Sequence, residues 1–182
     1  MITANESTSS DSRKPDRGRA FVDYIISRYQ ADKGVRAALT HADNPATEYQ
    51  CWDILAGFGV NLEYENQRLP FATVAAAIAR AKAEQNGALT IGKAIARCYE
   101  EGNASDQAKA KLRRLLACDS VAEVCRILRP LLRLIESKVG VGLNYAELLN
   151  DLLWFDHDES RDRIKARWAQ SFYGTDFGEG TE

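Results

Sequence analysis

The chain has 182 residues, 45% of them apolar, which is enough for one domain, or two small ones, with a hydrophobic core. The chain has 24 basic and 26 acidic residues, so it lacks the strongly basic composition of a protein that binds nucleic acid by itself. Any nucleic-acid binding must therefore come from local basic patches. No apolar stretch approaches about 18 residues and the first residues include no apolar segment, so we expect a cytoplasmic protein that neither spans a membrane nor is secreted.

Apolar residues in the first half of the chain recur every three or four positions, as expected for helices that bury one face. Asn44 and Pro45 indicate the start of the third helix, because asparagine caps a helix and proline suits its first position. The segment 57–69 begins with two closely spaced glycines and has no helical period, so it is predicted to be a loop. The helices predicted in this half cover residues 17–30, 32–42, 45–57 and 70–85.

Five further helices are predicted in the second half. Ser120, with Glu123 three positions later, forms a capping box that begins the seventh helix. Pro130 lies inside that helix and predicts a kink or a split near Arg129. In the ninth helix, Trp168 and the apolar residues one turn away on either side are expected to pack on leucines of the eighth helix. The other helix starts are predicted at Thr90, at Ser105 or Asn103, and after Asn144.

The whole chain is therefore predicted to be all-α, with roughly nine helices in two packed helical units. We expect a disordered N-terminal tail over residues 1–16 and an N-terminal helical unit over 17–86. A C-terminal four-helix-type bundle is expected over 87–174, followed by a flexible tail over 175–182. No repeat of about 20 to 50 residues is apparent, which favours a bundle over a solenoid.

The sequence contains no residue pattern typical of catalysis, metal binding or cofactor binding. Its four cysteines include no CxxC pair, and the charged run around His157 does not place metal ligands on one helix face. Gly57 and Gly140 each begin a glycine pair, but neither pair continues as GxGxxG. No paired carboxylates and no nucleophile–base set occur at a suitable spacing. We therefore predict a protein that is not an enzyme and that uses no metal or cofactor.

Charge is distributed unevenly along the chain. Residues 80–138 hold 12 basic and 7 acidic side chains, a net charge of +5, whereas residues 139–182 hold 4 basic and 9 acidic side chains, a net charge of −5. On the seventh predicted helix, three arginines lie on one face, opposite a face of leucine, isoleucine and valine. This arginine face is either a plain solvated surface or a surface that binds nucleic acid. The basic residues of the sixth and seventh helices are Lys109, Lys111, Arg113, Arg114, Arg126, Arg129 and Arg133.

Four stretches of the chain resemble the CasB family, the small subunit of the type I-E CRISPR Cascade surveillance complex. They are DKGVRAAL (32–39), LTIGKAIA (89–96), LRRLLACDS (112–120, with Leu128-Arg129 after it), and LLNDLLW (148–154) followed by RWAQSFY (167–173). Each stretch alone is weak, but their order and separation together are specific. One departure is that Thr40 and His41 stand where many members of the family have two basic residues.

The resemblance implies a non-catalytic, all-helical subunit. Its partners would be the other Cascade subunits, neighbouring copies of itself, the guide RNA–target DNA hybrid and the displaced single-stranded DNA. Its basic face would bind nucleic-acid backbone and stabilise the R-loop, because replacing DNA pairs by RNA–DNA pairs is nearly balanced in free energy and backbone contacts can tip the exchange.

The arginine face and the matched motifs together identify a set of candidate nucleic-acid-binding residues. Those expected to contribute are Arg36, Lys93, Arg113, Arg114, Arg126 and Arg129, together with Arg68, Arg97 and Arg133. The alternative is a helical scaffold subunit whose basic face binds an acidic protein partner and makes no direct contact with DNA.

Overall fold

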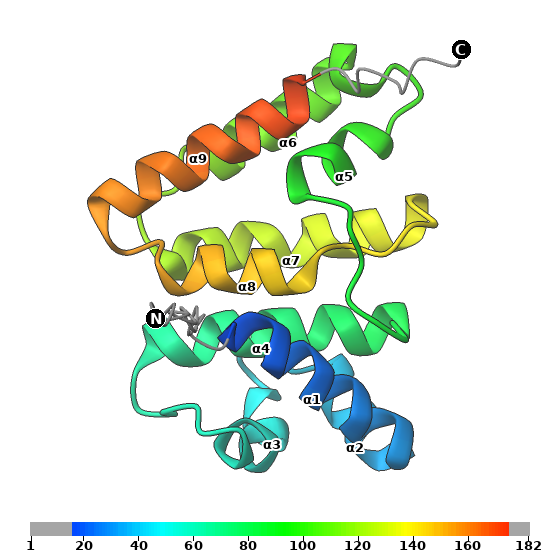
Figure 1. Cartoon of the computed structure of the whole chain (residues 1–182), viewed down its shortest axis with the longest axis vertical. Helices are drawn as coiled ribbons and strands as arrows, with labels where there is room; N and C mark the ends of the chain where they lie inside the picture. The colour runs from blue at the N-terminus through cyan, green and yellow to red at the C-terminus, as the bar shows by residue number, and fades with distance from the viewer. Residues whose placement is uncertain (1–15, 175–182) are drawn as a thin grey trace, which may run out of the picture.

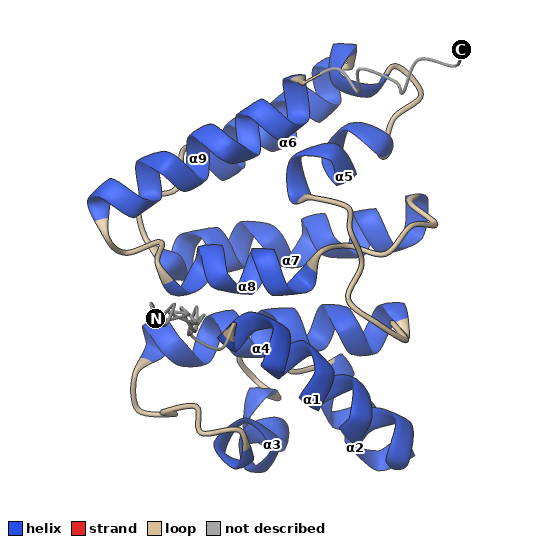
Figure 2. Ribbon diagram, in the orientation of Figure 1, coloured by secondary structure: helices blue, strands red, loops and turns tan. Residues whose placement is uncertain are grey.

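The computed structural model describes residues 16–174 (Figure 1), and the predicted tails lie outside this range except for Asp16. Within it the chain forms nine α-helices and two short 3₁₀ helices, without a strand (Figure 2), so the all-α prediction is confirmed. The helices are α1 (Arg17–Ala31), α2 (Lys33–Thr40), η1 (Glu48–Cys51), α3 (Trp52–Gly57), α4 (Glu65–Ala81), α5 (Ile91–Arg97), η2 (Gly102–Ala104), α6 (Asp106–Leu116), α7 (Val121–Lys138), α8 (Tyr145–Leu153) and α9 (Asp158–Tyr173). None of these helices is long and apolar enough to cross a membrane.

Side-chain caps begin five of the α-helices. The cap at Ser120 was predicted, and Ser105 and Asn144 are at predicted helix starts. Ser105, Ser120 and Asn144 accept hydrogen bonds from backbone N–H groups three residues later, at the starts of α6, α7 and α8. Such caps satisfy N–H groups that have no partner within the helix. Thr90 precedes α5 but makes no side-chain cap bond. The other two caps are Asp16 and Asp32.

Two predicted boundaries around α3 and α4 are wrong. Asn44 and Pro45 form a turn, in which the Asn44 side chain accepts a hydrogen bond from the Ala46 N–H, and helical structure begins only at η1. Helix α4 begins at Glu65, so Pro70 lies inside it, and it ends at Ala81, where Lys82 adopts a left-handed conformation with φ 52°. Proline removes only one helical hydrogen bond, and the buried run that follows Pro70 outweighs this loss.

Helix α7 is not split at Pro130 but runs without a break to Lys138. Pro130 is exposed, whereas Leu128, Leu131 and Leu132 around it are buried. Interior proline costs a helix roughly 3 kcal/mol, and burying three leucines contributes more than that, at about 1.5–3 kcal/mol each. Burial of the leucines therefore keeps the helix continuous.

The helices stack along the long axis of the molecule (Figure 1). Helix α4 is the central helix, and every residue from 70 to 79 is buried. It packs against α1 and α2 and against α7 and α8, while α5 packs on α6, α7 and α9. The buried residues form one hydrophobic cluster that extends across residue 86, where the two units were predicted to meet. The division into two units stays a prediction.

Helix α9 buries Ile164, Trp168 and Phe172 on one face, as the spacing predicted. Helix α9 contacts α8, where Trp168 donates a hydrogen bond to Asp151, but it packs mainly on α5 and α6, which was not predicted. Gly92 on α5 allows this approach, since a Cβ atom at that position would lie 2.3 Å from the carbonyl oxygen of Trp168. A glycine-mediated helix crossing leaves no periodic apolar signal, so the sequence pattern did not reveal it.

Candidate nucleic-acid interface

A basic surface lies where α6 meets α7. Arg113 and Arg114 are at the end of α6, Arg126 is on the second turn of α7, and all three side chains are exposed. None of them forms an ion pair with another residue of the described part of the chain. We call these three arginines the α6–α7 basic corner.

A short turn at Cys118 joins the two helices of the basic corner. The Cys118 thiol donates a hydrogen bond to the carbonyl oxygen of Arg114, 3.4 Å away. Burial raises the pKa of this thiol, and the positive charges of Lys165 and Arg126 oppose that increase. Both Arg114 and Arg126 therefore lie close to the same turn.

The acidic residue of this turn, Asp119, has its own cationic partner. The Lys165 Nζ atom is 3.2 Å from an Asp119 carboxylate oxygen, and Arg161 donates a hydrogen bond to the Asp119 carbonyl oxygen at 3.0 Å. Because α9 supplies these cations, Asp119 does not cancel the charge of the basic corner. Residues 139–182 carry a net negative charge, so their composition did not indicate that α9 supplies cations to this turn. The spacing of four between Arg161 and Lys165 does place these two residues on one helix face.

The arginines of the predicted stripe on α7 have different surroundings. Arg129 is half-buried, and its Nε atom is buried without a hydrogen-bond partner in the described structure. One Nη atom of Arg133 is 3.7 Å from one carboxylate oxygen of Asp43, and the other oxygen of Asp43 accepts a hydrogen bond from Arg80 at 2.8 Å. Only Arg126 is exposed without an acidic partner among the described residues, so the stripe does not present three equivalent cations.

Arg68 forms part of a buried cluster in the N-terminal half. Its guanidinium group pairs with the buried carboxylate of Glu48, donates to the carbonyl oxygen of Leu62 at 2.6 Å and lies 5.8 Å from the centre of the Trp52 ring. Its charge is thus compensated inside the protein. Sequence reasoning missed this role because Glu48 is 20 positions away.

The remaining predicted residues lie on α2 and α5. Arg36 is exposed on α2 and lines an open hollow of about 510 Å³ together with Lys33, Thr40 and His41. Because α2 packs on α1 and α4 at the opposite end of the molecule from α6, Arg36 is separate from the basic corner (Figure 1). On α5, Arg97 is exposed and Lys93 is half-buried.

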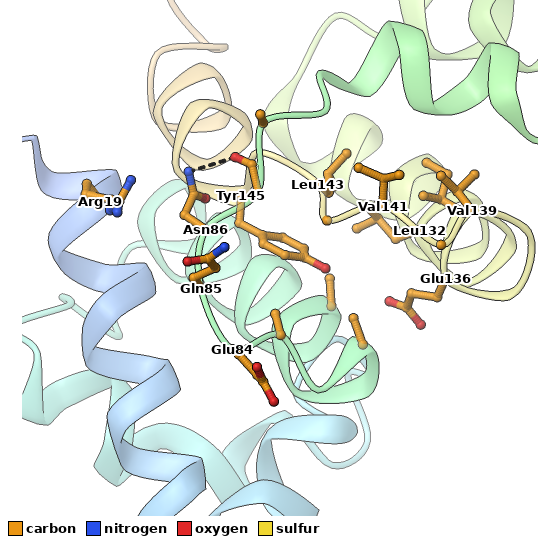
Figure 3. A pocket seen from close by; sticks show the side chains of 18 residues that line it. Arg19, Glu84, Gln85, Asn86, Leu132, Glu136, Val139, Val141, Leu143 and Tyr145 are labelled. Carbon is orange, nitrogen blue, oxygen red and sulfur yellow. Dashed lines mark hydrogen bonds between the residues drawn. The ribbon is translucent and has the colours of Figure 1, made fainter.

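A larger hollow, of about 840 Å³, lies between the end of α4 and the turn that precedes α8 (Figure 3). Apolar side chains such as Leu132 and Val139 line one part of it, and Glu84 and Glu136 supply its acidic groups. The Glu136 carboxylate already accepts a hydrogen bond from the Arg80 guanidinium at 3.0 Å. None of the predicted nucleic-acid-binding residues lines this hollow, so it is separate from the basic corner.

Comparison with known proteins places the chain in a family. A family model described as CRISPR-associated protein Cse2 matches residues 35–173. A Cse2-family protein from Thermus thermophilus is 24% identical, with a TM-score of 0.66 over 87% of this chain and 98% of its own. No curated protein matches the chain.

Two further solved structures are similar. CasB from M. ruber is 25% identical, with a TM-score of 0.66 over 86% of this chain and 92% of its own. A chain of a CRISPR RNA-guided surveillance complex is 20% identical, with a TM-score of 0.63 over 86% of this chain and 89% of its own. The matched family model spans most of the sequence and confirms the family indicated by the four motifs, so this chain belongs to the CRISPR-associated Cse2 family.

Proposed function

We propose that this chain is the non-catalytic small subunit of a type I-E CRISPR Cascade complex and that its α6–α7 basic corner binds nucleic-acid backbone. Membership of the Cse2 family supports the first part, as does the likeness to a chain of an RNA-guided surveillance complex. The observation that carries the second part is the exposure of Arg113, Arg114 and Arg126 beside an aspartate that α9 already compensates.

The role follows from how an R-loop forms. An RNA–DNA hybrid is about as stable as the DNA duplex that it replaces, so a few contacts to the displaced strand shift the equilibrium toward the open state. Arginines bind phosphates and release counterions without reading the bases. The corner needs no catalytic group for this role. Arg36 and Arg97 would contribute separate contacts, and we leave Arg68 out because Glu48 compensates its charge.

Charge reversal in the reconstituted complex tests this proposal. The variant Arg114→Glu/Arg126→Glu should weaken binding of target DNA by a similar factor for all target sequences, because phosphate contacts carry no base information. We expect a loss of at least about tenfold at physiological salt, measured by gel shift with several matched guide–target pairs.

A second double variant, Arg28→Glu/Lys82→Glu, is the matched control. This control changes the net charge by the same amount. Arg28 is exposed in the last turn of α1, and Lys82 is exposed directly after α4. Normal target binding by this control, together with the loss in the first variant, would assign the effect to the basic corner. If the first variant binds target DNA normally, the corner does not hold nucleic acid. Normal target binding together with loss of another subunit from the complex would instead support the scaffold alternative.

A further inference from the structure

A second surface combines exposed aromatic rings with negative charge, and its Glu65 lines a hollow of about 350 Å³ together with Arg126 of the basic corner. Three large aromatic side chains are exposed here, Tyr49 at 60%, Trp52 at 39% and Tyr64 at 57%. Between Arg36 and Arg68 the chain contains no lysine or arginine, and its five acidic residues there are Asp43, Glu48, Asp53, Glu63 and Glu65. We call Tyr49, Trp52 and Tyr64, with the exposed Asp53, Glu63 and Glu65, the aromatic–acidic surface.

The centre of this surface is held rigid by the buried Glu48. Its carboxylate accepts a hydrogen bond from the Trp52 indole N–H at 3.2 Å and pairs with Arg68. The Arg68 guanidinium in turn lies over the Trp52 ring and binds the Leu62 carbonyl oxygen just before Tyr64. This chain of contacts ties η1 and α3 to the start of α4, so the exposed part of Trp52 is presented in a fixed orientation.

Fixed, partly exposed tryptophan and tyrosine side chains are typical anchors of protein–protein interfaces, because little conformational entropy is lost when they are covered. The surrounding charge decides which partner they fit. Phosphate groups would be repelled by Asp53 and Glu63, whereas arginine and lysine side chains would pair with these carboxylates and stack on the aromatic rings. Charge complementarity thus favours a basic protein segment over a nucleic acid.

We propose that the aromatic–acidic surface docks an arginine- or lysine-rich segment of a different protein subunit in the assembled complex. The arginine or lysine side chains of that segment cover Trp52 and pair with Asp53 and Glu63. This inference rests on the proposed membership of a multi-subunit complex. It adds a protein-binding surface that lies beside the nucleic-acid-binding corner.

A photocrosslinking experiment in the reconstituted complex tests the identity of the occupant. Tyr64 is replaced by p-benzoylphenylalanine, a conservative aromatic change at an exposed position, and the complex is irradiated with labelled guide RNA and target DNA present. We expect a crosslink to a peptide of another subunit that carries several arginines or lysines. The matched control places the same group at Tyr173, which is 48% exposed at the end of α9, and should not label that peptide. Crosslinks only to RNA or DNA, only to a second copy of this chain, or to nothing would overturn the proposal.

An affinity measurement gives an independent readout. The variant Asp53→Lys/Glu63→Lys should bind the remaining subunits at least about tenfold more weakly, while Glu100→Lys/Glu101→Lys, with the same change of charge at exposed positions after α5, should bind normally. Failure of the wild-type chain to co-purify with the other subunits would overturn both proposals. Normal co-purification of the wild type and unchanged affinity of the first variant would overturn only this inference.

Discussion

Asp151 is a buried carboxylate that links α8 to α9. One of its oxygens accepts a hydrogen bond from the Trp168 indole N–H at 2.7 Å, and the other pairs with Arg167. Burial raises the pKa of this carboxyl to about 6, although the hydrogen bond from Trp168 and the charge of Arg167 oppose the shift. The Asp151 carboxylate is therefore charged at neutral pH, and this charge lowers the free energy of unfolding.

This raised pKa predicts how stability depends on pH. The carboxyl titrates near 3.8 in the unfolded chain and near 6 in the folded protein, so between these values the folded state binds more protons. The contribution of Asp151 to the free energy of unfolding is thus full below about pH 4 and falls as pH rises toward 6. Relative to Asp151→Asn, the wild type should lose about 2 kcal/mol between about pH 4 and pH 6.5.

Urea denaturation of both proteins across this pH range checks the prediction. Asp162→Asn, at an exposed position of α9, controls for the loss of one negative charge and should keep the wild-type pH profile. Parallel profiles for the wild type and Asp151→Asn would show that Asp151 does not titrate in this window.

Trp168 combines apolar burial with this hydrogen bond. It is 2% exposed, and its ring stacks on Phe155 with 5.7 Å between the ring centres. Trp168→Ala should lower the free energy of unfolding by about 3 to 5 kcal/mol, because it opens a cavity and leaves the Asp151 carboxylate without its indole partner. Trp154, which is 59% exposed, supplies the matched control. Trp154→Ala should change stability by less than about 1 kcal/mol, and equal melting temperatures for the two variants would contradict this picture of α9.

At the scale of elements, the crossing of α5 and α9 depends on Gly92. A Cβ atom there would lie 2.1 Å from the Ser171 hydroxyl oxygen and 2.3 Å from the Trp168 carbonyl oxygen. Gly92→Ala should therefore destabilise the protein by about 1 to 3 kcal/mol, although alanine is by itself the better helix former by about 1 kcal/mol.

Gly140→Ala is the control for this substitution. A Cβ atom at Gly140 would have no neighbour within 4 Å, so thermal unfolding of that variant should match the wild type to within about 1 kcal/mol. A Gly92→Ala variant that melts at or above the wild-type temperature would show that α5 and α9 can move apart freely.

The elements also show which parts of the fold the sequence could predict. The cap at Ser120 and the helix starts at Ser105 and after Asn144 were predictable because a cap involves a side chain and a backbone group only three residues apart. The start of α4 was missed because Pro70 is typical of a helix start, and only the burial of the whole run 70–79 shows that it lies inside. The docking of α9 on α5 was missed because it depends on contacts between distant segments.

In the whole molecule, the candidate site was likewise predictable where it depends on local sequence. It was not predictable where it depends on contacts between distant segments. The positive charge of residues 80–138 indicated α6 and α7 correctly as basic elements. Which arginines are available to a partner depends on acids far away in sequence, such as Glu48 beside Arg68 and Asp43 beside Arg133. Periodicity assigns a residue to a helix face, but it does not reveal the residue's partner on another helix.

Arg114 has no acidic partner among the described residues, whereas Arg68 pairs with Glu48. Replacing each by glutamine should therefore have opposite effects on stability and on the salt dependence of target binding. Arg114→Gln should leave the melting temperature unchanged, because the side chain is exposed and unpaired among the described residues. In the assembled complex it should lower the slope of log affinity against log salt by at most about one, the value for one lost phosphate contact.

Arg68→Gln should lower the stability of the protein without changing the salt slope of target binding. It leaves the Glu48 carboxylate, whose side chain is 7% exposed, without its cation. We expect a loss of about 2 to 4 kcal/mol in the free energy of unfolding, below the upper range for buried pairs because Arg68 is 21% exposed. The salt slope of target binding should not change. Since both variants lose one positive charge, a lower slope for Arg68→Gln with unaltered stability would place Arg68 on the nucleic-acid surface and show that Glu48 does not compensate its charge.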